Sequence, residues 1–174
     1  MAENVVDKVI ELLGAEGGRA KYGGSVTKGL PISGGELGGS EGFETFVAKQ
    51  TKEGVRFGFR QEEAAFLARR YGSNVEHVFA RAAAAAELTE RYKLPLALAV
   101  QLLYAIEEEM AVKPVDFLIR RTGDLFFRIA DVQQWKSAVI AAMADRLGWS
   151  SEQRTEYARE LERKLEEAVE PGQV

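Results

Sequence analysis

The uneven distribution of glycine is the feature that most constrains what this chain can fold into. Thirteen of its 17 glycines lie between Gly14 and Gly58, where they equal the apolar residues in number. Such a stretch is too free in its backbone and too poor in side chains to build a hydrophobic core of its own. We therefore interpret residues 14–58 as an extended connector with one short helix over 41–49, for which Ser40 is the expected N-cap.

The residues before the connector have the apolar spacing of a helix. Apolar side chains recur at helical intervals from Val5 to Leu13, and Gly14 is expected to be the C-cap. This helix has no neighbouring segment on which to pack. We therefore interpret residues 1–13 as the remnant of an element that belongs to an upstream domain.

The first half of the region after the connector, residues 59–174, has nearly continuous helical periodicity. An apolar stripe from Ala64 to Tyr71 is ended by Gly72. Ser73 and Glu76 then have the spacing of a capping box, which predicts a helix start near residue 74. The segment 96–106 is apolar almost all round, interrupted only by Gln101 and the Tyr104 hydroxyl, and is expected to be the central helix.

The second half of this region continues the same pattern. Pro114 predicts the first turn of a short helix that runs to Ile119, and the next helix is expected over 132–147, closed by Gly148. Ser150 and Gln153 form another capping box, at the start of a final helix that ends near Val169 and carries a Glu160–Lys164 pair. Because no segment alternates apolar and polar residues, residues 59–174 predict a compact all-α domain of about six helices.

Composition excludes several classes of function. The 174 residues contain no cysteine and a single histidine, His77, which excludes zinc fingers, iron–sulfur clusters, thiol catalysis and multi-histidine metal centres. The formal net charge of −4 argues against binding to nucleic acid. No apolar run reaches the roughly 20 residues of a membrane-spanning helix, and residues 1–7 lack the basic head of a signal peptide. We expect a cytoplasmic protein, for which peripheral contact with a membrane stays open.

Three short motifs in the first half of the chain resemble functional sites, and each has a simpler interpretation. Residues 38–42 fit the G-x-S-x-G pattern of a serine nucleophile, but no buried strand precedes Ser40, so we interpret it as a helix cap. Thr27 and Lys28 could present a cation and backbone donors to an anion, although a surface turn explains them. His77 faces away from the apolar stripe and is expected to be solvated.

The second half of the chain offers two further clusters. Residues 107–109 are three consecutive glutamates, which could bind a metal or a basic partner but also suit a solvated helix end. Arg120 and Arg121 could clamp a phosphate or carboxylate, and the simpler account pairs them with these glutamates. Trp135 and Trp149 occupy core and helix-end positions. The residues by themselves therefore predict no catalytic, cofactor-binding or metal-binding site.

Several ordered motifs nevertheless occur together as they do in one known family. They are Met1–Asp7, Thr27-Lys28, Pro31-Ile32-Ser33-Gly34-Gly35, Tyr71-Gly72-Ser73-Asn74, Ile106–Met110, Arg120–Phe127 and Leu147-Gly148-Trp149. On these motifs, which extend over nearly the whole chain, it resembles the C-terminal portion of the FAD-dependent, quinone-linked glycerol-3-phosphate dehydrogenases and their sister glycerophosphate oxidases. Arg60 departs from the family pattern, in which a threonine caps the helix that follows.

The resemblance implies that the full-length protein oxidises glycerol 3-phosphate to dihydroxyacetone phosphate and passes electrons through FAD to a membrane quinone or to oxygen. In this family the flavin and substrate sites lie mainly in an N-terminal FAD domain, on which the helical C-terminal domain packs. Residues 1–13 would then be the last helix of that upstream FAD domain, which is the expected partner. We expect this chain alone to hold no FAD and to be inactive. The resemblance assigns no residue of this sequence as a flavin ligand or catalytic group, and Thr27 and Lys28 come nearest to one.

Two alternatives stay open from the sequence. The chain could be a free-standing helical module that binds another protein, or a serine hydrolase that uses Ser40. A long upstream reading frame with a Gly-x-Gly-x-x-Gly motif after a strand would favour the enzyme fragment, and labelling of Ser40 by a fluorophosphonate would favour the hydrolase.

Overall fold

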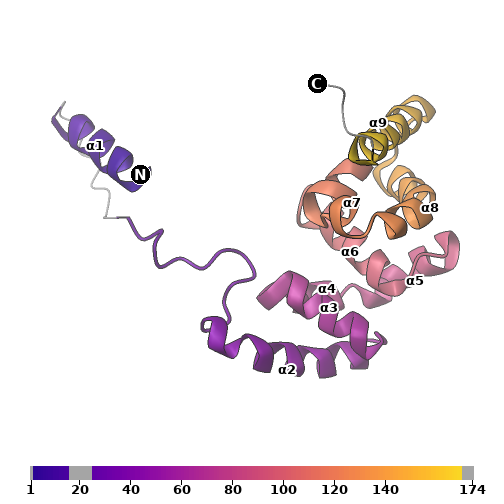
Figure 1. Ribbon diagram of the computed structural model, residues 1–174, viewed down its shortest axis with the longest axis horizontal. Coiled ribbons are helices and arrows are strands. Elements are labelled where there is room, and N and C mark those ends of the chain that lie inside the picture. Colours follow the sequence, from indigo (N-terminus) through magenta and orange to yellow (C-terminus); the bar gives the residue numbers. More distant parts are fainter. Residues whose placement is uncertain (1, 16–24, 170–174) are drawn as a thin grey trace. The chain divides into compact units, whose positions relative to one another are not determined.

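The computed structural model describes residues 2–15 and 25–169 (Figure 1). Every regular element among these residues is a helix, so the all-α prediction is confirmed. The chain divides into two compact units, Met1–Ser33 and Gly34–Val174. The first contains helix α1 (Ala2–Ala15), and the second contains the remaining helices.

The elements of the second unit follow one another with short connections. In chain order they are η1 (Ser40–Gly42), α2 (Phe43–Arg56), α3 (Gln61–Tyr71), η2 (Gly72–Asn74), α4 (Val75–Phe79), α5 (Ala82–Tyr92), α6 (Leu96–Glu107), η3 (Asp116–Arg121), α7 (Asp124–Phe127), α8 (Ile129–Leu147) and α9 (Ser151–Val169). The helices are more numerous than expected, because α4 and α7 are separate short helices.

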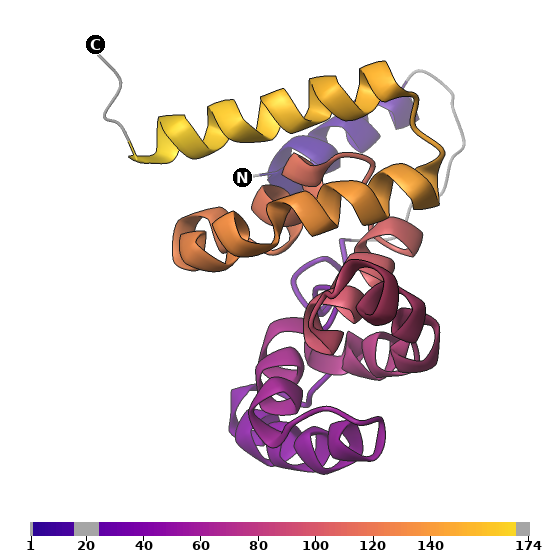
Figure 2. The same ribbon diagram turned by 90° about the vertical axis from the view of Figure 1, so that its right-hand side faces the viewer.

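Helix α6 is the centre of the second unit, as its apolar sequence predicts. Seven of its side chains are buried: Ala99, Val100, Gln101, Leu102, Leu103, Tyr104 and Ala105. It contacts α3 and α4 on one side and α5 and η3 on others. Helices α8 and α9 lie side by side as a hairpin (Figure 2). Leu161 and Leu165 of α9 are buried, so this hairpin completes the core.

Helix α2 packs along α3 over a more extensive contact than any other pair of helices in the second unit. Gly54 makes this possible, because a Cβ atom there would lie 2.6 Å from the Cβ of Ala64 and 2.8 Å from the Cζ of Phe79. The helix expected over 41–49 therefore extends to Arg56, where packing on α3 supplies the apolar contacts that its own sequence lacks. The division into 1–13, 14–58 and 59–174 stays a prediction.

Local capping predictions have mixed outcomes. Ser150 and Gln153 form the expected box, with the Ser150 N–H donating to Gln153 Oε1 at 2.9 Å and the Gln153 N–H donating to Ser150 Oγ at 3.2 Å. Gly148 ends α8 in the left-handed conformation, with φ of 66°. Ser40 is wrong as a cap, because it lies inside η1 and neither η1 nor α2 has a side-chain cap.

Three other local predictions are wrong. Ser73 and Glu76 do not cap each other, because Ser73 Oγ donates to Glu36 and the Glu76 carboxylate accepts from Gln50 Nε2. Helix α1 continues past Gly14 to Ala15. Glu160 pairs with Lys113 and Lys164 pairs with Glu167, so the Glu160–Lys164 pair does not form.

Candidate functional site

The segment that follows α6 contains a rare element, a π-helix. Pro114 begins a helix as predicted, but from Asp116 to Arg121 its hydrogen bonding is that of a π-helix, and it ends at Arg121 rather than Ile119. Thr122 closes it, because its N–H and its Oγ1 both donate to the Phe117 carbonyl, at 3.0 and 2.9 Å. Single-turn π-helices occur frequently at functional sites, so this region is the first place to look for one.

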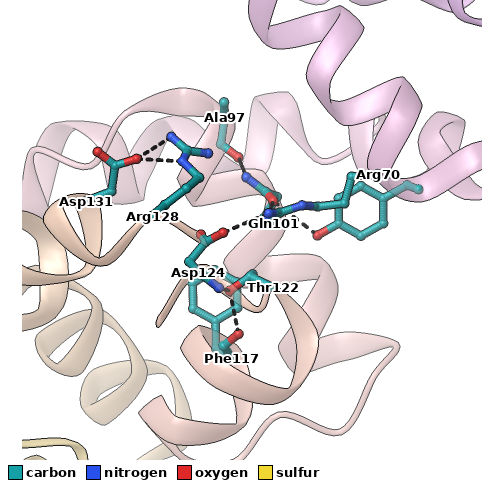
Figure 3. A network of polar contacts seen from close by, with 9 residues as sticks. Arg70, Ala97, Gln101, Phe117, Thr122, Asp124, Arg128 and Asp131 are labelled. Carbon is teal, nitrogen blue, oxygen red and sulfur yellow. Dashed lines mark hydrogen bonds and ion pairs between the residues drawn. The ribbon is translucent and has the colours of Figure 1, made fainter. Parts of the chain in front are cut away.

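The π-helix delivers Asp124 into the interior. Asp124 is 4% exposed, and its N–H donates to Thr122 Oγ1 at 3.3 Å. Its Oδ1 accepts from Arg70 Nη2 of α3 at 2.7 Å, while Arg70 Nη1 donates to Oε1 of Gln101 at 2.9 Å (Figure 3). The Arg70 guanidinium therefore joins α3, α6 and α7 through two nearly buried side chains. Removing one partner of such a buried pair leaves an uncompensated charge.

The same network extends to a buried tyrosine. The Tyr71 hydroxyl donates to Gln101 Oε1 at 3.5 Å, and its ring meets the Tyr104 ring edge-on with centroids 5.3 Å apart. Gln101 Nε2 is satisfied by the Ala97 carbonyl at 2.7 Å. Burial raises the pKa of Tyr71 well above its usual range, and the nearby Glu109 carboxylate adds to this. Tyr71 is therefore neutral at physiological pH and acts as a hydrogen-bond donor.

Glu109, whose carboxylate lies near Tyr71, is only partly satisfied by hydrogen bonds. Its Oε2 is buried without a hydrogen-bond partner. Burial raises the pKa of the Glu109 carboxyl, and the positive charge of Arg121 opposes that rise. The next residue, Met110, has a positive φ of 55°, which is unusual for a residue other than glycine. A protonated Glu109 is therefore easier to accommodate here than a charged one.

A cleft of about 530 Å³ opens beside the network. Gln101 and Asp124 line it together with Phe66, Leu98, Arg128 and Trp135. The Phe66 ring lies between two guanidinium groups, with the Arg70 Cζ 4.6 Å and the Arg128 Cζ 4.9 Å from its centroid. Arg128 is held in place by Asp131, through Nε at 2.7 Å (Figure 3).

The chemistry that this cleft can perform is limited because most of its charged side chains form ion pairs within the chain. Arg60 pairs with Glu63, Arg128 pairs with Asp131, and Asp124 pairs with Arg70 of the network. The lining of the cleft contains no serine, histidine or lysine. Within the described part of the chain, no three His, Cys, Asp or Glu side chains are placed to hold a metal ion. The network therefore holds helices together, and we find no arrangement in it that would carry out a reaction.

A second unusual contact fixes the connector to the end of α3, and we call it the glycine clasp, formed by Gly34 and Gly72. The Gly34 carbonyl accepts from the Ser73 N–H at 3.0 Å, and both glycines have positive φ, 86° and 53°. A Cβ on Gly72 would lie 2.0 Å from the Gly34 oxygen, and a Cβ on Gly34 would lie 2.7 Å from the Tyr71 oxygen. Ser73 Oγ also donates to Glu36 at 2.8 Å. Neither glycine can therefore carry a side chain without disturbing the clasp.

Four of the residues considered from sequence are exposed, each on the surface of its own unit. Thr27 and Lys28 form an exposed turn in the first unit, in which the Gly29 N–H donates to the Val26 carbonyl at 3.0 Å, as the turn interpretation predicts. His77 is exposed, in agreement with the solvated interpretation. Ser40 is exposed as well, and no strand precedes it among the residues that the structure describes.

The acidic cluster at 107–109 finds other partners than expected. Arg81 bridges Glu107 and Glu108, with Nε and Nη2 donating at 2.9 and 2.6 Å, and Arg146 also donates to Glu107. Arg120 instead pairs with Asp116, so its predicted pairing with the cluster is wrong. Arg121 does reach the cluster, but through the backbone carbonyl of Glu109.

The two tryptophans are only half-buried. Trp135 lines the cleft, and Trp149 meets Tyr157 edge-on with ring centroids 5.0 Å apart.

The sequence analysis did not identify the residues that form the network, which are Arg70, Gln101 and Asp124. Gln101 did carry a signal, because it is an amide in an otherwise apolar helix and a buried amide needs partners.

Comparison with known proteins gives consistent matches. Residues 25–154 match the family model described as the C-terminal domain of alpha-glycerophosphate oxidase. The aerobic glycerol-3-phosphate dehydrogenase of Bacillus subtilis is 42% identical over 171 residues, which are 98% of this chain and 31% of that protein. The protein of the same name from Staphylococcus epidermidis is 44% identical over 168 residues, 97% of this chain and 30% of its own length.

A solved structure is similar in fold as well. The X-ray structure of the glycerol-3-phosphate dehydrogenase from Bacillus halodurans complexed with FAD matches with a TM-score of 0.89 and 41% identity. The match covers 99% of this chain and 34% of that one. The chain thus spans about a third of the length of the proteins that it matches.

Proposed function

The chain belongs to the family of alpha-glycerophosphate oxidase C-terminal domains, and on this premise we propose that it is the C-terminal domain of an FAD-dependent glycerol-3-phosphate dehydrogenase. The observation that carries the proposal is the coverage: 98% of this chain aligns with only 31% of the Bacillus subtilis enzyme. The proposed parent oxidises glycerol 3-phosphate to dihydroxyacetone phosphate and delivers the two electrons to a quinone. Its other two thirds would contain the flavin and substrate sites.

The residues present in this chain do not fit FAD. In the Rossmann-type site, the pyrophosphate of a dinucleotide lies at a glycine-rich turn between a strand and a helix N-terminus. Among residues 2–15 and 25–169 there is no strand to carry such a turn, and no two glycines of the connector are spaced as Gly-x-Gly. We therefore assign FAD to the upstream part of the parent and no chemical step to this chain.

Helix α1 supports the existence of an upstream partner. Apart from Ile10, which is partly buried, its large apolar residues are exposed by about half, from 47% for Val9 to 59% for Val5. Together with Val6, Leu12 and Leu13 they form one side of an amphipathic helix, and such a side needs another surface to cover it. We propose that the flavin domain supplies that surface and that the helical domain in turn supports the flavin domain.

The proposed localisation rests on the helices of this chain and on the quinone acceptor of the proposed parent. Among residues 2–15 and 25–169, no helix combines the length and the apolar character needed to cross a bilayer. Because a quinone acceptor is dissolved in the membrane, we propose that the parent works in the cytoplasm, in peripheral contact with the inner face of the plasma membrane.

A chimera tests the proposed function. The matched third of the Bacillus subtilis enzyme is replaced by this chain, and flavin absorbance and dye reduction dependent on glycerol 3-phosphate are measured. We expect the chimera to retain FAD and to reduce the dye within tenfold of the rate of the Bacillus subtilis enzyme, and we expect the same enzyme cut before the matched region to lose stability or activity. A chimera no better than the cut enzyme would contradict the proposal.

Two further measurements sharpen the test. Val9→Asp places a charge on the apolar side of α1, whereas Asn4→Asp places one on its polar side as the matched control. We expect only the first to lower the melting temperature of the chimera, and neither to change the melting of the isolated chain. Flavin absorbance that copurifies with the isolated chain would show that the assignment of FAD to the upstream part is wrong.

A further inference from the structure

Two consecutive phenylalanines stand out on the surface of the second unit. Phe126 is 67% exposed and Phe127 is 85% exposed. Both lie at the end of α7, whose first two residues, Asp124 and Leu125, are buried at 4% exposure each. The short helix is therefore fixed at one end by the Arg70–Asp124 pair and presents two aromatic rings at the other.

A hollow lies next to this aromatic pair. It has a volume of about 380 Å³ and is bounded by η3, α7 and α9. Its lining combines the apolar residues Val115, Ile119, Leu125, Phe126 and Ala168 with the charged residues Arg120, Glu160, Lys164 and Glu167. A projecting aromatic ring beside a hollow with both apolar and charged lining residues is the geometry of a protein interface, in which large side chains fill pockets and are surrounded by polar groups.

The charged groups around this surface have partners within the chain. Arg120 pairs with Asp116, Arg121 donates to the Glu109 carbonyl, and Lys164 pairs with Glu167 at 2.6 Å. A surface for anionic lipid would instead present uncompensated cations.

We propose that the surface formed by Arg120, Phe126, Phe127 and the adjoining hollow is where the flavin-binding part of the parent docks. This inference rests on the proposed function. The proteins that match this chain carry about two thirds of their length outside the matched region. A partner in the same polypeptide is present at an effective concentration of about millimolar, which favours it over a separate protein or a second copy.

The absence of cysteine from the sequence makes a direct test possible. Phe127→Cys is introduced into the isolated chain and into the chimera, and the rate of maleimide labelling at position 127 is measured by peptide mass spectrometry. Val55→Cys is the matched control, because Val55 is an apolar side chain on α2 with 49% exposure. We expect labelling at position 127 to be at least tenfold slower in the chimera than in the isolated chain, and labelling at position 55 to be unchanged.

The other outcomes overturn the inference. Equal labelling of position 127 in an active chimera that contains FAD overturns the docking surface alone, whereas equal labelling in an inactive chimera overturns the proposed function as well. Equal protection at positions 127 and 55 shows an unspecific effect. Slower labelling of the isolated chain with vesicles of anionic phospholipid, or with rising chain concentration, assigns the surface to lipid or to a second copy instead.

A second variant tests the energetic side of the proposal. Phe127→Ser removes the most exposed ring of the pair and leaves the buried half of α7 intact. We expect the melting temperature of the isolated chain to stay the same and that of the chimera to fall. A chimera whose melting temperature does not change would overturn the inference.

Discussion

Helix α1 and helix α3 have the same kind of apolar periodicity, but their apolar side chains differ in burial. In α3 the repeating side chains Ala64, Leu67 and Ala68 are completely buried, whereas in α1 the repeating side chains Val5 and Leu12 are 59% and 57% exposed. The sequence pattern is equivalent in both. Periodicity therefore identifies the side of a helix that needs cover, but it does not tell whether the same stretch of chain supplies that cover.

The largest expected effect tests this comparison directly. Leu67→Ala leaves a cavity in the core and should cost about 2–5 kcal/mol of unfolding free energy. Leu12→Ala makes the same chemical change on the exposed side of α1 and should cost less than about 0.5 kcal/mol in the isolated chain. Chemical denaturation followed by circular dichroism measures both. Equal losses would show that α1 has a packing partner within this chain.

A second effect, of similar size, concerns the charged contact between Arg70 and Asp124 in the second unit. Asp124→Ala leaves Arg70 without its carboxylate partner and should cost about 3–5 kcal/mol of unfolding free energy, measured by denaturation. The double change Arg70→Met with Asp124→Leu removes both charges and should recover most of that loss. If the double variant is as unstable as the sum of the two single ones, the pair is not coupled as described.

A smaller effect distinguishes the clasp from ordinary backbone strain. Gly72→Ala forces a Cβ against the Gly34 oxygen and places alanine at φ of 53°, which together should cost at least about 2 kcal/mol. Gly148→Ala has a similar φ of 66° but nothing within 4 Å of its Cβ, so it should cost only about 1 kcal/mol. Thermal unfolding compares them, and equal losses would mean that the clasp contributes nothing.

The smallest effect depends on pH. Because the folded state raises the pKa of Glu109, folding favours its protonated form, and stability falls as the pH rises above the ordinary glutamate value of about 4.3. Glu109→Gln should therefore raise the melting temperature at pH 7. The gain should fade as the pH falls below that ordinary value, where the natural side chain is protonated in both states. A gain that is constant with pH would point to a cause other than ionisation.

The sequence predicts those parts of the fold that depend on near neighbours. The apolar segment of α6, the end of α8 at Gly148 and the Ser150–Gln153 box each involve residues within a few positions of one another, and they are confirmed. The Ser73–Glu76 box has equally good spacing and does not form. Its groups are taken by Gly34, Glu36 and Gln50, whose Nε2 donates to Glu76 at 2.7 Å. Local spacing carries no information about such distant competitors.

The interior polar network could not be predicted from the sequence, because its members are also far apart along the chain. Arg70 lies 31 positions from Gln101 and 54 from Asp124, and only the packing of α3 against α6 and α7 brings them together. The π-helix was equally hidden, since Pro114 indicates a helix start but not the spacing of its hydrogen bonds. The motifs that carried the family resemblance did contain Asp124, Gly34 and Gly72, although their contacts appear only in the structure.

The glycine clasp also determines where this chain can be lengthened. Extra residues inserted before Ser33 would add to a stretch that ends where the second unit begins, and they would leave its hydrogen bonds intact. Extra residues between Gly34 and Glu36 would separate two groups that accept hydrogen bonds from Ser73, the carbonyl of Gly34 and the carboxylate of Glu36. Anyone joining this domain to a new protein should therefore place the seam before Ser33.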